Sequence, residues 1–411
     1  MRRTRRGWLA WGCVVAFLVP GCAPSKSTPK AIVIWEQMDP DERARFEQNL
    51  DVFRERHPGI EIRHLPYDTE QLRNQFQTAA AAGGGPQLVF GPSDQVGPLS
   101  LLRLIKPLDT TLPAGFFERF IPAALDTLDG HLWAAPDQVG NHLVLCFNKA
   151  LVKKAPEGSN EFIALARKLT TPARGGQPSH YGFALNTTEP YWLIPFFTGF
   201  GGWVMDGRRE PTLDTPAMVQ ALSYLRDLKY KYAVMPRESD YQVAETLFKE
   251  GQAAMIVNGP WSWSGYRKAG IDLGIAPIFK MPNGQWARPM TASKGYSINT
   301  NVRKDELPLV IELVTFLTSP EAQLRSATEL GILPSHRAAY RDSAILNDPF
   351  LRISQEAFEK GRRMPVVPEM RVLWDTMRPS LQNVMNGARA PEAAAEEMQR
   401  TSVQQLADMK K

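Results

Sequence analysis

The residues of this chain whose types and spacing could do chemistry are tryptophans that follow a buried strand. The apolar run 253–257 reads as that strand, and the Asn-Gly-Pro of 258–260 then makes a turn. Trp261 and Trp263 are therefore expected just beyond the strand's carboxyl end, where open α/β sheets keep their ligand sites. Two indoles at that edge predict a site for a ligand with flat apolar faces.

Two further stretches combine aromatic rings with polar groups. Glu189 stands close to Tyr191 and Trp192, and Met364 precedes Trp374. Sugars need such surroundings, because their C–H faces stack on aromatic rings while their hydroxyls bond carboxylates in charge-assisted pairs. The alternative for any one tryptophan is a place in the core, which is the commoner role of a single Trp.

Signatures of catalysis and metal binding are absent from the sequence, which has no His-Glu-x-x-His, no Gly-x-Ser-x-Gly and no phosphate-loop lysine. The glycines at 83–85 end in Pro86 and predict a loop between a helix and a strand. Six scattered histidines offer no ligand set, so no metal and no cofactor is expected. The rival reading from another class is a secreted glycoside hydrolase that uses Asp94 and Glu189 as its two carboxylates.

The N-terminus predicts export. Arginines within 2–6 precede the apolar run 8–19, which is shorter than the ~20 residues needed to span a bilayer. Residues 1–21 are therefore expected to be a signal peptide that is removed. The formal net charge of +5 depends on the arginines of this segment, and without them it is +1. Because the other basic residues are interspersed with acids, no nucleic-acid partner is expected.

Cysteine usage agrees with an exported protein that has a lipid anchor. The stretch 18–22, Leu-Val-Pro-Gly-Cys, resembles the lipobox of bacterial lipoproteins, which implies that Cys22 is lipidated at the start of a tether over 22–30. Cys13 would leave with the signal peptide. Cys146, flanked by apolar residues, is expected to be buried in a strand without a disulfide partner.

Strands and helices alternate along the rest of the chain, which indicates mostly parallel sheets with helices on both faces. Asp39, Pro40 and Glu42 have the pattern of a helix start after the first strand. Val403, Leu406 and Met409 predict one apolar side of a C-terminal helix that packs on its own lobe. The expected strands are 32–35, 60–62, 87–90, 182–185 and 254–257, and the expected helices are 72–82, 161–169, 216–228, 241–250, 307–317, one after Ser319, and 391–411.

From about residue 32 to about residue 385 the chain resembles the maltodextrin-binding proteins, family 1 extracellular solute-binding proteins that serve bacterial ABC importers. The strongest stretches are 189–191, 248–263 and 364–374. The resemblance implies a periplasmic-binding-protein-like α/β fold, with two lobes that each hold a mostly parallel sheet and that hinge around a ligand cleft. The expected N-terminal lobe is 31–137 plus 288–337, and the expected C-terminal lobe is 138–287 plus 338–411.

The resemblance also implies sugar contacts. Asp39 and Asp94 match acids of the first lobe that bond glucosyl hydroxyls in the relatives. The matching contacts of the second lobe are Glu189, Tyr191, Trp261, Met364 and Trp374, and Arg378, one helical turn beyond Trp374, is a further candidate.

Departures from the family pattern gather in the first lobe. Pro40 replaces a lysine, Gly91 and Gln95 replace an aromatic residue and an arginine around Asp94, and Gly140-Asn141-His142 stands where an acid is expected. Asn141 and His142 would supply replacement hydrogen bonds or serve a structural role. Loss of charge and stacking from this lobe implies that the preferred sugar need not be maltose.

The expected function is capture of a linear maltodextrin-like oligosaccharide and its delivery to an ABC permease by a non-catalytic, monomeric protein outside the cytoplasmic membrane. Other oligosaccharides, such as trehalose or a β-linked sugar, are the nearest alternative ligands. A sugar phosphate is less expected, because no cluster of Arg and Lys stands beside the tryptophan pair. A chemoreceptor or sensor kinase would be a further partner that reads the closed lobes.

Overall fold

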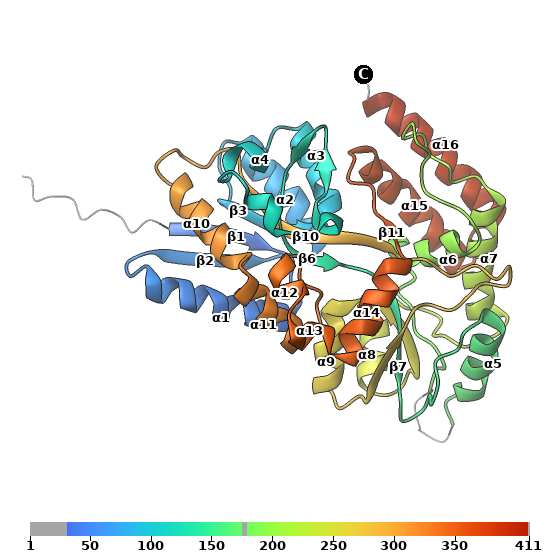
Figure 1. Cartoon of the computed structure of the whole chain (residues 1–411). Helices are drawn as coiled ribbons and strands as arrows, with labels where there is room; N and C mark the ends of the chain where they lie inside the picture. The colour runs from blue at the N-terminus through green and yellow to red at the C-terminus, as the bar shows by residue number, and fades with distance from the viewer. Residues whose placement is uncertain (1–30, 175–178, 410–411) are drawn as a thin grey trace, which may run out of the picture.

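The computed structural model describes residues 31–174 and 179–409. They form two lobes, each built around its own sheet, which lie side by side in Figure 1. The signal peptide 1–21, the tether 22–30 and the lipidation candidate Cys22 lie outside the described residues. No helix within the described ranges is both long and apolar enough to cross a membrane.

The first lobe surrounds a six-stranded sheet. Its central strands β1, β2 and β3 are parallel, whereas β10 runs antiparallel to both β3 and β6. Fully and partly buried residues alternate along β1, because one face of this strand packs on α1 and the other on α2. The strands are β1 (Ala31–Glu36), β2 (Glu61–Pro66), β3 (Leu88–Pro92), β6 (Ala135–Gly140), β10 (Met290–Ile298) and β11 (Arg362–Arg363).

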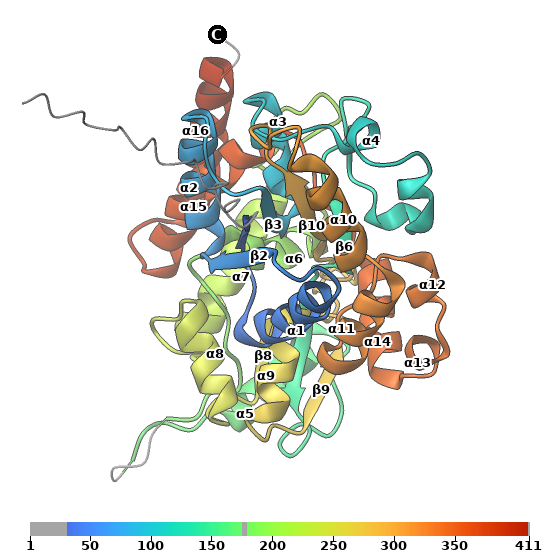
Figure 2. The ribbon, with the colours of Figure 1, turned by 90° about the vertical axis from the view of Figure 1, so that its left-hand side faces the viewer.

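Helices cover the first sheet on both faces, as the two views in Figure 1 and Figure 2 show. Sequence signals account for their starts: Ser319 caps α11 by accepting from the N–H of Ala322 at 3.3 Å, with Pro320 in the first turn. The helices are α1 (Pro40–Arg56), α2 (Thr69–Ala81), α3 (Val96–Leu101), α4 (Leu108–Thr111), α10 (Leu307–Leu317), α11 (Pro320–Leu330), α12 (Arg337–Tyr340) and α13 (Ser343–Leu346).

The second lobe surrounds a three-stranded sheet in the order β8-β7-β9. The fold class is confirmed, but these strands pair antiparallel, so the expectation of a mostly parallel second sheet is wrong for them. The expected strand 182–185 forms only isolated parallel bridges from Tyr181 and Ala184 to the β8 region. The strands are β7 (Val144–Asn148), β8 (Met255–Asn258) and β9 (Leu273–Ala276), and a separate hairpin joins β4 (Thr127–Leu128) to β5 (His131–Leu132).

The second lobe buries its largest apolar cluster between β7, β8 and the helices α6, α7, α15 and α16. Cys146 lies in β7, is fully buried and is free, as predicted. The helices are α5 (Ser159–Leu169), α6 (Ile194–Gly199), α7 (Pro216–Tyr230), α8 (Tyr241–Lys249), α9 (Trp263–Lys268), α14 (Pro349–Lys360), α15 (Glu369–Met385) and α16 (Pro391–Met409); short 3-10 helices cover Ser93–Gln95 (η1), Pro190–Trp192 (η4) and Pro260–Ser262 (η5).

The C-terminal helix α16 packs on α15 and α7 of its own lobe, as predicted, but with a different face. Leu406 is buried, whereas Val403 is 46% and Met409 is 38% exposed. The contacts are made instead by a stripe that includes Ala394 and Met398. This stripe shares only Leu406 with the predicted side, because residues 394, 398, 402 and 406 follow one another at one-turn spacing and Val403 and Met409 lie off that line.

The chain passes from the first sheet to the second within three residues. It leaves β6 at Gly140 and enters β7 at Val144, and it returns to the first sheet between β9 and β10. Asn141 in the short crossing has a positive φ of 36°, and Gly140 has φ 112°. A close pair of such backbone angles is typical of a sharp change of direction. The lobe boundaries 31–137 plus 288–337 and 138–287 plus 338–411 stay a prediction.

Candidate ligand-binding site

Four aromatic rings of the second lobe form a continuous row, which we call the aromatic row: Trp261, Trp192, Tyr191 and Trp374. Neighbouring ring centroids lie 6.4 Å, 5.6 Å and 6.3 Å apart in that order, and each pair meets edge to face. Trp192 is held by a hydrogen bond from its Nε1 to the carbonyl of Val257 at the end of β8, 2.9 Å away. The predicted residues Tyr191, Trp261 and Trp374 thus lie together, although they come from three separate elements.

Asp39 of the first lobe reaches one end of the aromatic row. It is the N-cap of α1, and its N–H donates to Glu42 Oε2 at 3.2 Å. Tyr241, the first residue of α8 in the second lobe, donates its hydroxyl proton to Asp39 Oδ2 over 3.3 Å. The same hydroxyl accepts from Trp261 Nε1 at 3.0 Å, so one phenol joins Asp39 to the row.

Asp94 reaches the other end of the row. It sits in η1, directly after β3, and its Oδ2 accepts a hydrogen bond from Trp374 Nε1 at 3.1 Å. Trp374 is only 6% exposed, because its ring is covered by the core of the second lobe as well as by Asp94. Two carboxylates of the first lobe therefore bracket aromatic groups of the second, with the lobes closed on each other.

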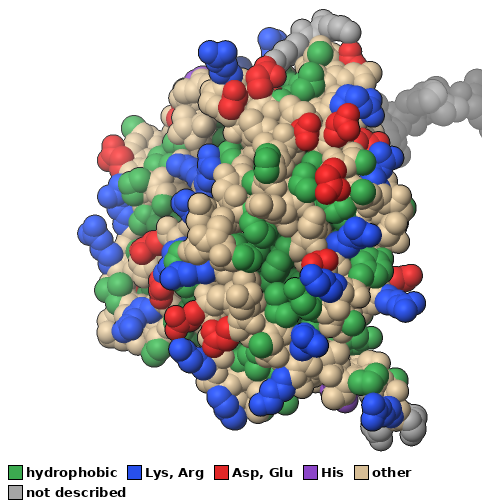
Figure 3. Space-filling model, turned by 90° about the vertical axis from the view of Figure 1, so that its right-hand side faces the viewer, with side chains coloured by type: hydrophobic (Ala, Val, Ile, Leu, Met, Phe, Trp, Pro, Cys, Tyr) green, Lys and Arg blue, Asp and Glu red, His purple; other side chains and the backbone are tan. Residues whose placement is uncertain are grey.

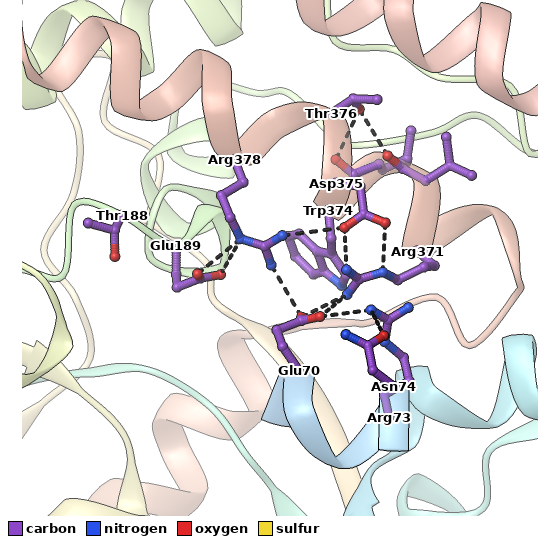
Figure 4. Close-up of polar contacts among 12 residues, drawn as sticks. Glu70, Arg73, Asn74, Thr188, Glu189, Arg371, Trp374, Asp375, Thr376 and Arg378 are labelled. Carbon is purple, nitrogen blue, oxygen red and sulfur yellow. Dashed lines mark hydrogen bonds and ion pairs between the residues drawn. The ribbon is translucent and has the colours of Figure 1, made fainter. Parts of the chain in front are cut away.

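An ion-pair cluster at the Trp374 end also joins the lobes (Figure 4). Arg378 donates to Glu189 Oε1 at 3.0 Å within the second lobe and to Glu70 of α2 at 3.2 Å across the cleft. Arg371, two turns earlier on α15, donates to the same Glu70 oxygen at 2.7 Å and pairs with Asp375. Glu70 thus receives two guanidinium groups from the opposite lobe.

A fourth contact between the lobes lies near the Asp39 end. Lys268 of α9 donates to Asp41 Oδ1 of α1 over 2.6 Å. The four contacts are made by different elements of each lobe, so the closed arrangement is fixed along the whole cleft. Side chains of both charge signs are interspersed over the face of the molecule drawn in Figure 3.

Burial between the lobes changes the acidity of both bracketing carboxyls. Burial, together with the neighbouring charges of Glu42 and Glu245, raises the pKa of Asp39 to about 7. Burial also raises the pKa of Asp94 to about 6, although the hydrogen bond from Trp374 opposes the change. A new hydrogen-bond donor would stabilise the charged form of either carboxyl, so binding of a donor group there is favourable.

The start of α1, which carries Asp39, is fixed by a buried ion pair below it. Lys294 of β10 lies 3.1 Å from Glu42 Oε2, and both side chains are almost fully buried. Gln138 of β6 donates to Glu42 Oε1 at 3.1 Å. This network ties α1 to the strands next to the crossing at 141–143 and sets the position of Asp39 relative to the second lobe.

Trp263 does not face the cleft, so the expectation that the turn after β8 displays two indoles is wrong. Its ring is fully buried, with the rings of Phe350 and His142 against it at centroid distances of 4.9 Å and 6.4 Å. The reason is local: Trp261 lies in η5 and Trp263 begins α9, and two helical steps turn a side chain to the opposite face.

Three other predicted positions lie at the back of the site. Met364 is 4% exposed and belongs to the same core cluster as Trp374. Asn141 contributes its backbone, since its carbonyl accepts from the hydroxyl of Tyr191. His142 is fully buried and burial lowers its pKa to about 4, which makes it a neutral core residue rather than a replacement ligand group.

Tyr241, Glu70 and Arg371 are contacts that sequence reasoning missed. Tyr241 was assigned only as the start of a helix, and its position one residue after the capping Asp240 gave no sign of its partner. Glu70 fell outside the predicted helix, which begins at Thr69 and not at residue 72. The sequence does carry a signal for Arg371. Arg371, Asp375 and Arg378 are charged residues at helical spacing, which places them on one face of α15.

The hydrolase alternative needs one of its two carboxylates to donate a proton. Glu189, one of the two carboxylates of the hydrolase alternative, is held by Arg378 at 3.0 Å, and a carboxylate in a charged pair is a poor proton donor. Within residues 31–174 and 179–409, no group of three His, Cys, Asp or Glu side chains is placed to hold a metal ion. Flat rings between acids offer instead the stacking faces and hydrogen-bond acceptors that a sugar ring requires.

A two-lobed α/β fold with such groups between its lobes is typical of a solute-binding protein. The family model described as "Bacterial extracellular solute-binding protein" matches residues 48–352, and the chain belongs to this family. The family and the relatives below are described as binding proteins.

Individual relatives agree. The maltotriose-binding protein of Pyrococcus abyssi is 27% identical over 89% of this chain and 79% of its own length, and the galactooligosaccharide-binding protein of Bacillus subtilis is 26% identical over 93% and 91%. The solved maltose/maltodextrin-binding domain of Bdellovibrio bacteriovorus, bound to maltotriose, is 38% identical with a TM-score of 0.89, over 92% of this chain and all of that one. The resemblance found in the sequence is confirmed.

Proposed function

We propose that this protein captures a maltodextrin-like oligosaccharide between its lobes and delivers it to the permease of an ABC importer. The observation that carries the proposal is the pair of bridges at the ends of the aromatic row, Asp39 to Tyr241 and Asp94 to Trp374. Each bridge joins a carboxylate of one lobe to an aromatic group of the other. A sugar chain lying along the row would meet stacking faces and acceptors from both lobes.

Closure follows from these contacts. In an open protein the first-lobe acids and the second-lobe rings are separated, and neither half alone offers a complete site. A sugar that contacts both halves stabilises the closed state by its additional interactions there. The crossing at 141–143 is the proposed hinge, and Tyr191 couples it to the site because its hydroxyl donates to the Asn141 carbonyl.

The proposed ligand contacts are those predicted from the sequence, with roles adjusted to the structure. Tyr191, Trp261 and Trp374 supply rings, Asp39 and Asp94 accept from hydroxyls, and Met364 and Asn141 support the rings from behind. Glu189 and Arg378 hold each other and border the cleft at the Trp374 end.

The ligand class is supported by the relatives, of which several carry maltotriose or maltodextrin in their names. The galactooligosaccharide-binding relative at 26% identity supports the alternative, a different oligosaccharide bound in the same role. Lipidation of Cys22 is part of the proposal, and a 23% identical relative from Streptococcus pneumoniae is named a solute-binding lipoprotein.

Calorimetric titration of the purified protein against maltose, maltotriose, trehalose, cellobiose and a galactooligosaccharide tests the proposal. We expect micromolar or tighter binding of maltotriose. Tight binding of another sugar with no response to maltotriose would move the proposal to that sugar. No binding to any member of the panel would contradict an oligosaccharide-binding role.

Incubation with maltoheptaose separates binding from hydrolysis. We expect the heptasaccharide to be recovered intact after prolonged incubation, because the acids of the site are engaged by Arg378, Trp374 and Tyr241. Shorter products that vanish in an Asp94→Asn variant would establish the hydrolase instead.

A further inference from the structure

The indole of Trp261 folds back onto the backbone two residues before it. A Cβ atom at residue 259, which is a glycine, would lie 2.1 Å from Cζ3, 2.2 Å from Cη2 and 2.6 Å from Cε3 of the Trp261 ring. Side chains do not tolerate such distances. The six-membered part of the indole therefore occupies the space that a side chain at residue 259 would need.

The backbone of Gly259 gives no other reason for a glycine. Its φ of −110° and ψ of 179° are extended values that any residue adopts. The close approach of the ring is thus the feature that excludes a larger residue here. Glycine meets this requirement because it has no Cβ.

Hydrogen bonds on both sides hold the backbone of Gly259. Its N–H donates to Asn258 Oδ1 at 2.9 Å, and its carbonyl accepts from the N–H of Ser262 at 3.1 Å and from the Ser262 hydroxyl at 2.8 Å. Gly259 is buried, whereas Trp261 is partly exposed. A Cβ at residue 259 would therefore displace the ring and not the chain.

Asn258 is itself fixed by a buried polar network. Its Nδ2 donates to Glu245 Oε1 of α8 at 2.8 Å and to the hydroxyl of Tyr266 of α9 at 2.7 Å, and Tyr266 donates to the same Glu245 oxygen at 2.6 Å. All three side chains are buried, and Lys249 pairs with Glu245. Figure 2 shows α8 and α9 beside β8, which carries Asn258. A shift of this backbone would leave buried polar atoms unpaired, which costs more free energy than turning a partly exposed ring.

The place on Gly259 gives Trp261 its contacts in the aromatic row. From there its Nε1 reaches the Tyr241 hydroxyl at 3.0 Å, and its ring meets that of Trp192 edge to face at a centroid distance of 6.4 Å. A ring displaced from residue 259 would lose the hydrogen bond. The row is thus ordered in advance at its Asp39 end, so a ligand binds without the cost of ordering this side chain.

We propose that Gly259 is a positioning residue for sugar binding, whose missing side chain sets the place of the Trp261 ring while the Asn258 network keeps the backbone from yielding. The inference rests on the proposed sugar-binding function. It adds a residue that acts on the ligand only through Trp261.

A double-mutant cycle, measured by calorimetric titration with maltotriose, tests this role. Gly259→Ala should bind maltotriose roughly tenfold more weakly than the wild type, as Trp261→Ala should. The double variant Gly259→Ala, Trp261→Ala should bind like Trp261→Ala alone, because the ring through which residue 259 acts is gone. A general structural effect of the substitution would instead make the two losses multiply.

Near-ultraviolet circular dichroism without sugar reports the surroundings of the ring itself. Gly259→Ala should change the tryptophan signal of the wild type and leave the signal of the Trp261→Ala variant unchanged. Gly207→Ala is the matched control, because a Cβ there meets nothing within 4 Å, and it should bind like the wild type. Gly274→Ala controls for strain: its Cβ would lie 2.3 Å from the ring of Phe147, which is outside the row, so this variant should lose thermal stability and keep its affinity.

If Gly259→Ala does not fold, the double variant decides. Without the indole the added methyl group meets no ring, so the double variant should fold and bind like Trp261→Ala. A double variant that also fails to fold would refute the proposal, because something other than the ring would then exclude the Cβ.

The outcomes separate the two proposals. If the wild type binds maltotriose and Gly259→Ala keeps the wild-type affinity, or if the two losses multiply, the positioning role is refuted and the proposed function stands. If the wild type prefers another oligosaccharide, the maltodextrin proposal fails and the same cycle with that sugar decides on Gly259. If it binds no sugar, both proposals fail.

Discussion

Tyr241 and Asp39 join the two lobes through a hydrogen bond of 3.3 Å from the phenol to Oδ2. Because the same phenol oxygen accepts from Trp261 at 3.0 Å, the acid of one lobe and the ring of the other are linked through a single atom. A sugar hydroxyl that enters here could replace the phenol both as the donor to Asp39 and as the acceptor from Trp261. The closed protein therefore carries in its own side chains the hydrogen bonds that a ligand would take over.

Replacing Tyr241 by Phe should loosen the closed form. The change removes one neutral hydrogen bond to each of Asp39 and Trp261, worth about 1 kcal/mol each at most in net terms. Small-angle scattering without sugar should show a larger radius of gyration for the variant. Tyr230→Phe, whose hydroxyl bonds Met385 inside the second lobe, is the control; an equal response from both would show that the effect is not one of closure.

The tryptophans of the aromatic row need different substitutions. Trp261 is partly exposed, and Trp261→Ala should weaken maltotriose binding roughly tenfold while the protein stays folded. Trp374 is 6% exposed, so its replacement by Ala would open a core cavity at a cost of ~3–5 kcal/mol. Trp374→Phe is the better probe, because it keeps an aromatic ring, removes the bond to Asp94 and leaves a smaller void than Ala would.

Calorimetry on Trp261→Ala and Trp374→Phe, with circular dichroism to verify folding, decides whether the row binds sugar. Trp286→Ala serves as the control, since that ring packs with Lys280 and Lys360 instead. Wild-type affinity in both row variants would remove the row from the site.

Closure without sugar should depend on pH through Asp39 and Asp94. Their pKa values in the closed form are about 7 and about 6, raised by burial from 3.8, and solvent restores the lower value when the cleft opens. Groups with raised pKa values bind protons on closing, so their contribution to the closed state is present at low pH and is lost as the pH rises from about 4 to about 7. Above that range it should be constant.

Tryptophan fluorescence and small-angle scattering between pH 5 and pH 8 measure this dependence. The double variant Asp39→Asn, Asp94→Asn should show a nearly flat response. A closed fraction that increases with pH in the wild type would contradict the assigned pKa shifts. Global unfolding is a separate readout, because the pKa of buried His142 is lowered to about 4 and its contribution is lost as the pH falls.

Glu70→Gln should weaken the ionic link between the lobes. Burial raises the pKa of Glu70, but the hydrogen bond and charge of Arg371 outweigh it and hold the pKa below its usual range. Glu70 is 40% exposed, so solvent reduces the pair to about 1 kcal/mol. Sugar affinity should fall a few-fold, and its dependence on salt should decrease, in titrations at low and high ionic strength.

The matched control for Glu70 is Glu47→Gln. Glu47 has the same 40% side-chain exposure but pairs with Arg54 inside the first lobe. A loss of affinity in both variants would point to stability of the first lobe and not to contacts between lobes.

The buried face of α16 gives a prediction on stability. Met398 is fully buried, and Met398→Ala should lower the free energy of unfolding by ~2–5 kcal/mol in urea titrations. Val403→Ala should change it by less than about 0.5 kcal/mol, because this side chain is 46% exposed. A larger loss of unfolding free energy in Val403→Ala than in Met398→Ala would instead support the face that the apolar pattern predicts.

Most elements could be predicted from the sequence because their signals are local. The first strand and the start of α1 follow from an apolar run and from Asp39-Pro40 with Glu42, all within a few residues of one another. Tyr191, Trp261 and Trp374 could be named because motifs of the family surround them. The apolar residues on both sides of Cys146 likewise predicted correctly that it lies in a buried strand.

Pairings between distant residues could not be predicted. Asp39 and Tyr241 are 202 residues apart, and nothing near either one specifies the other. Trp263 was misplaced because a spacing of two puts side chains on one face of a strand but on opposite faces of a helix. The face of α16 was misassigned because its buried stripe includes Ala394, Ala395 and Ser402, which a pattern of large apolar residues does not reveal.

Cys146 has a practical consequence. It is the sole cysteine in residues 31–174 and 179–409, its side chain is fully buried in β7, and burial raises the pKa of its thiol. Thiol-reactive dyes should therefore leave it unlabelled, so a protein without residues 1–30 would be labelled only at cysteines introduced on its surface. Asp41 and Lys268, which face each other across the cleft at 2.6 Å, are the natural positions for a fluorophore and a quencher. The molecule is thus already suited to conversion into an optical sensor that reports occupancy as a change in brightness.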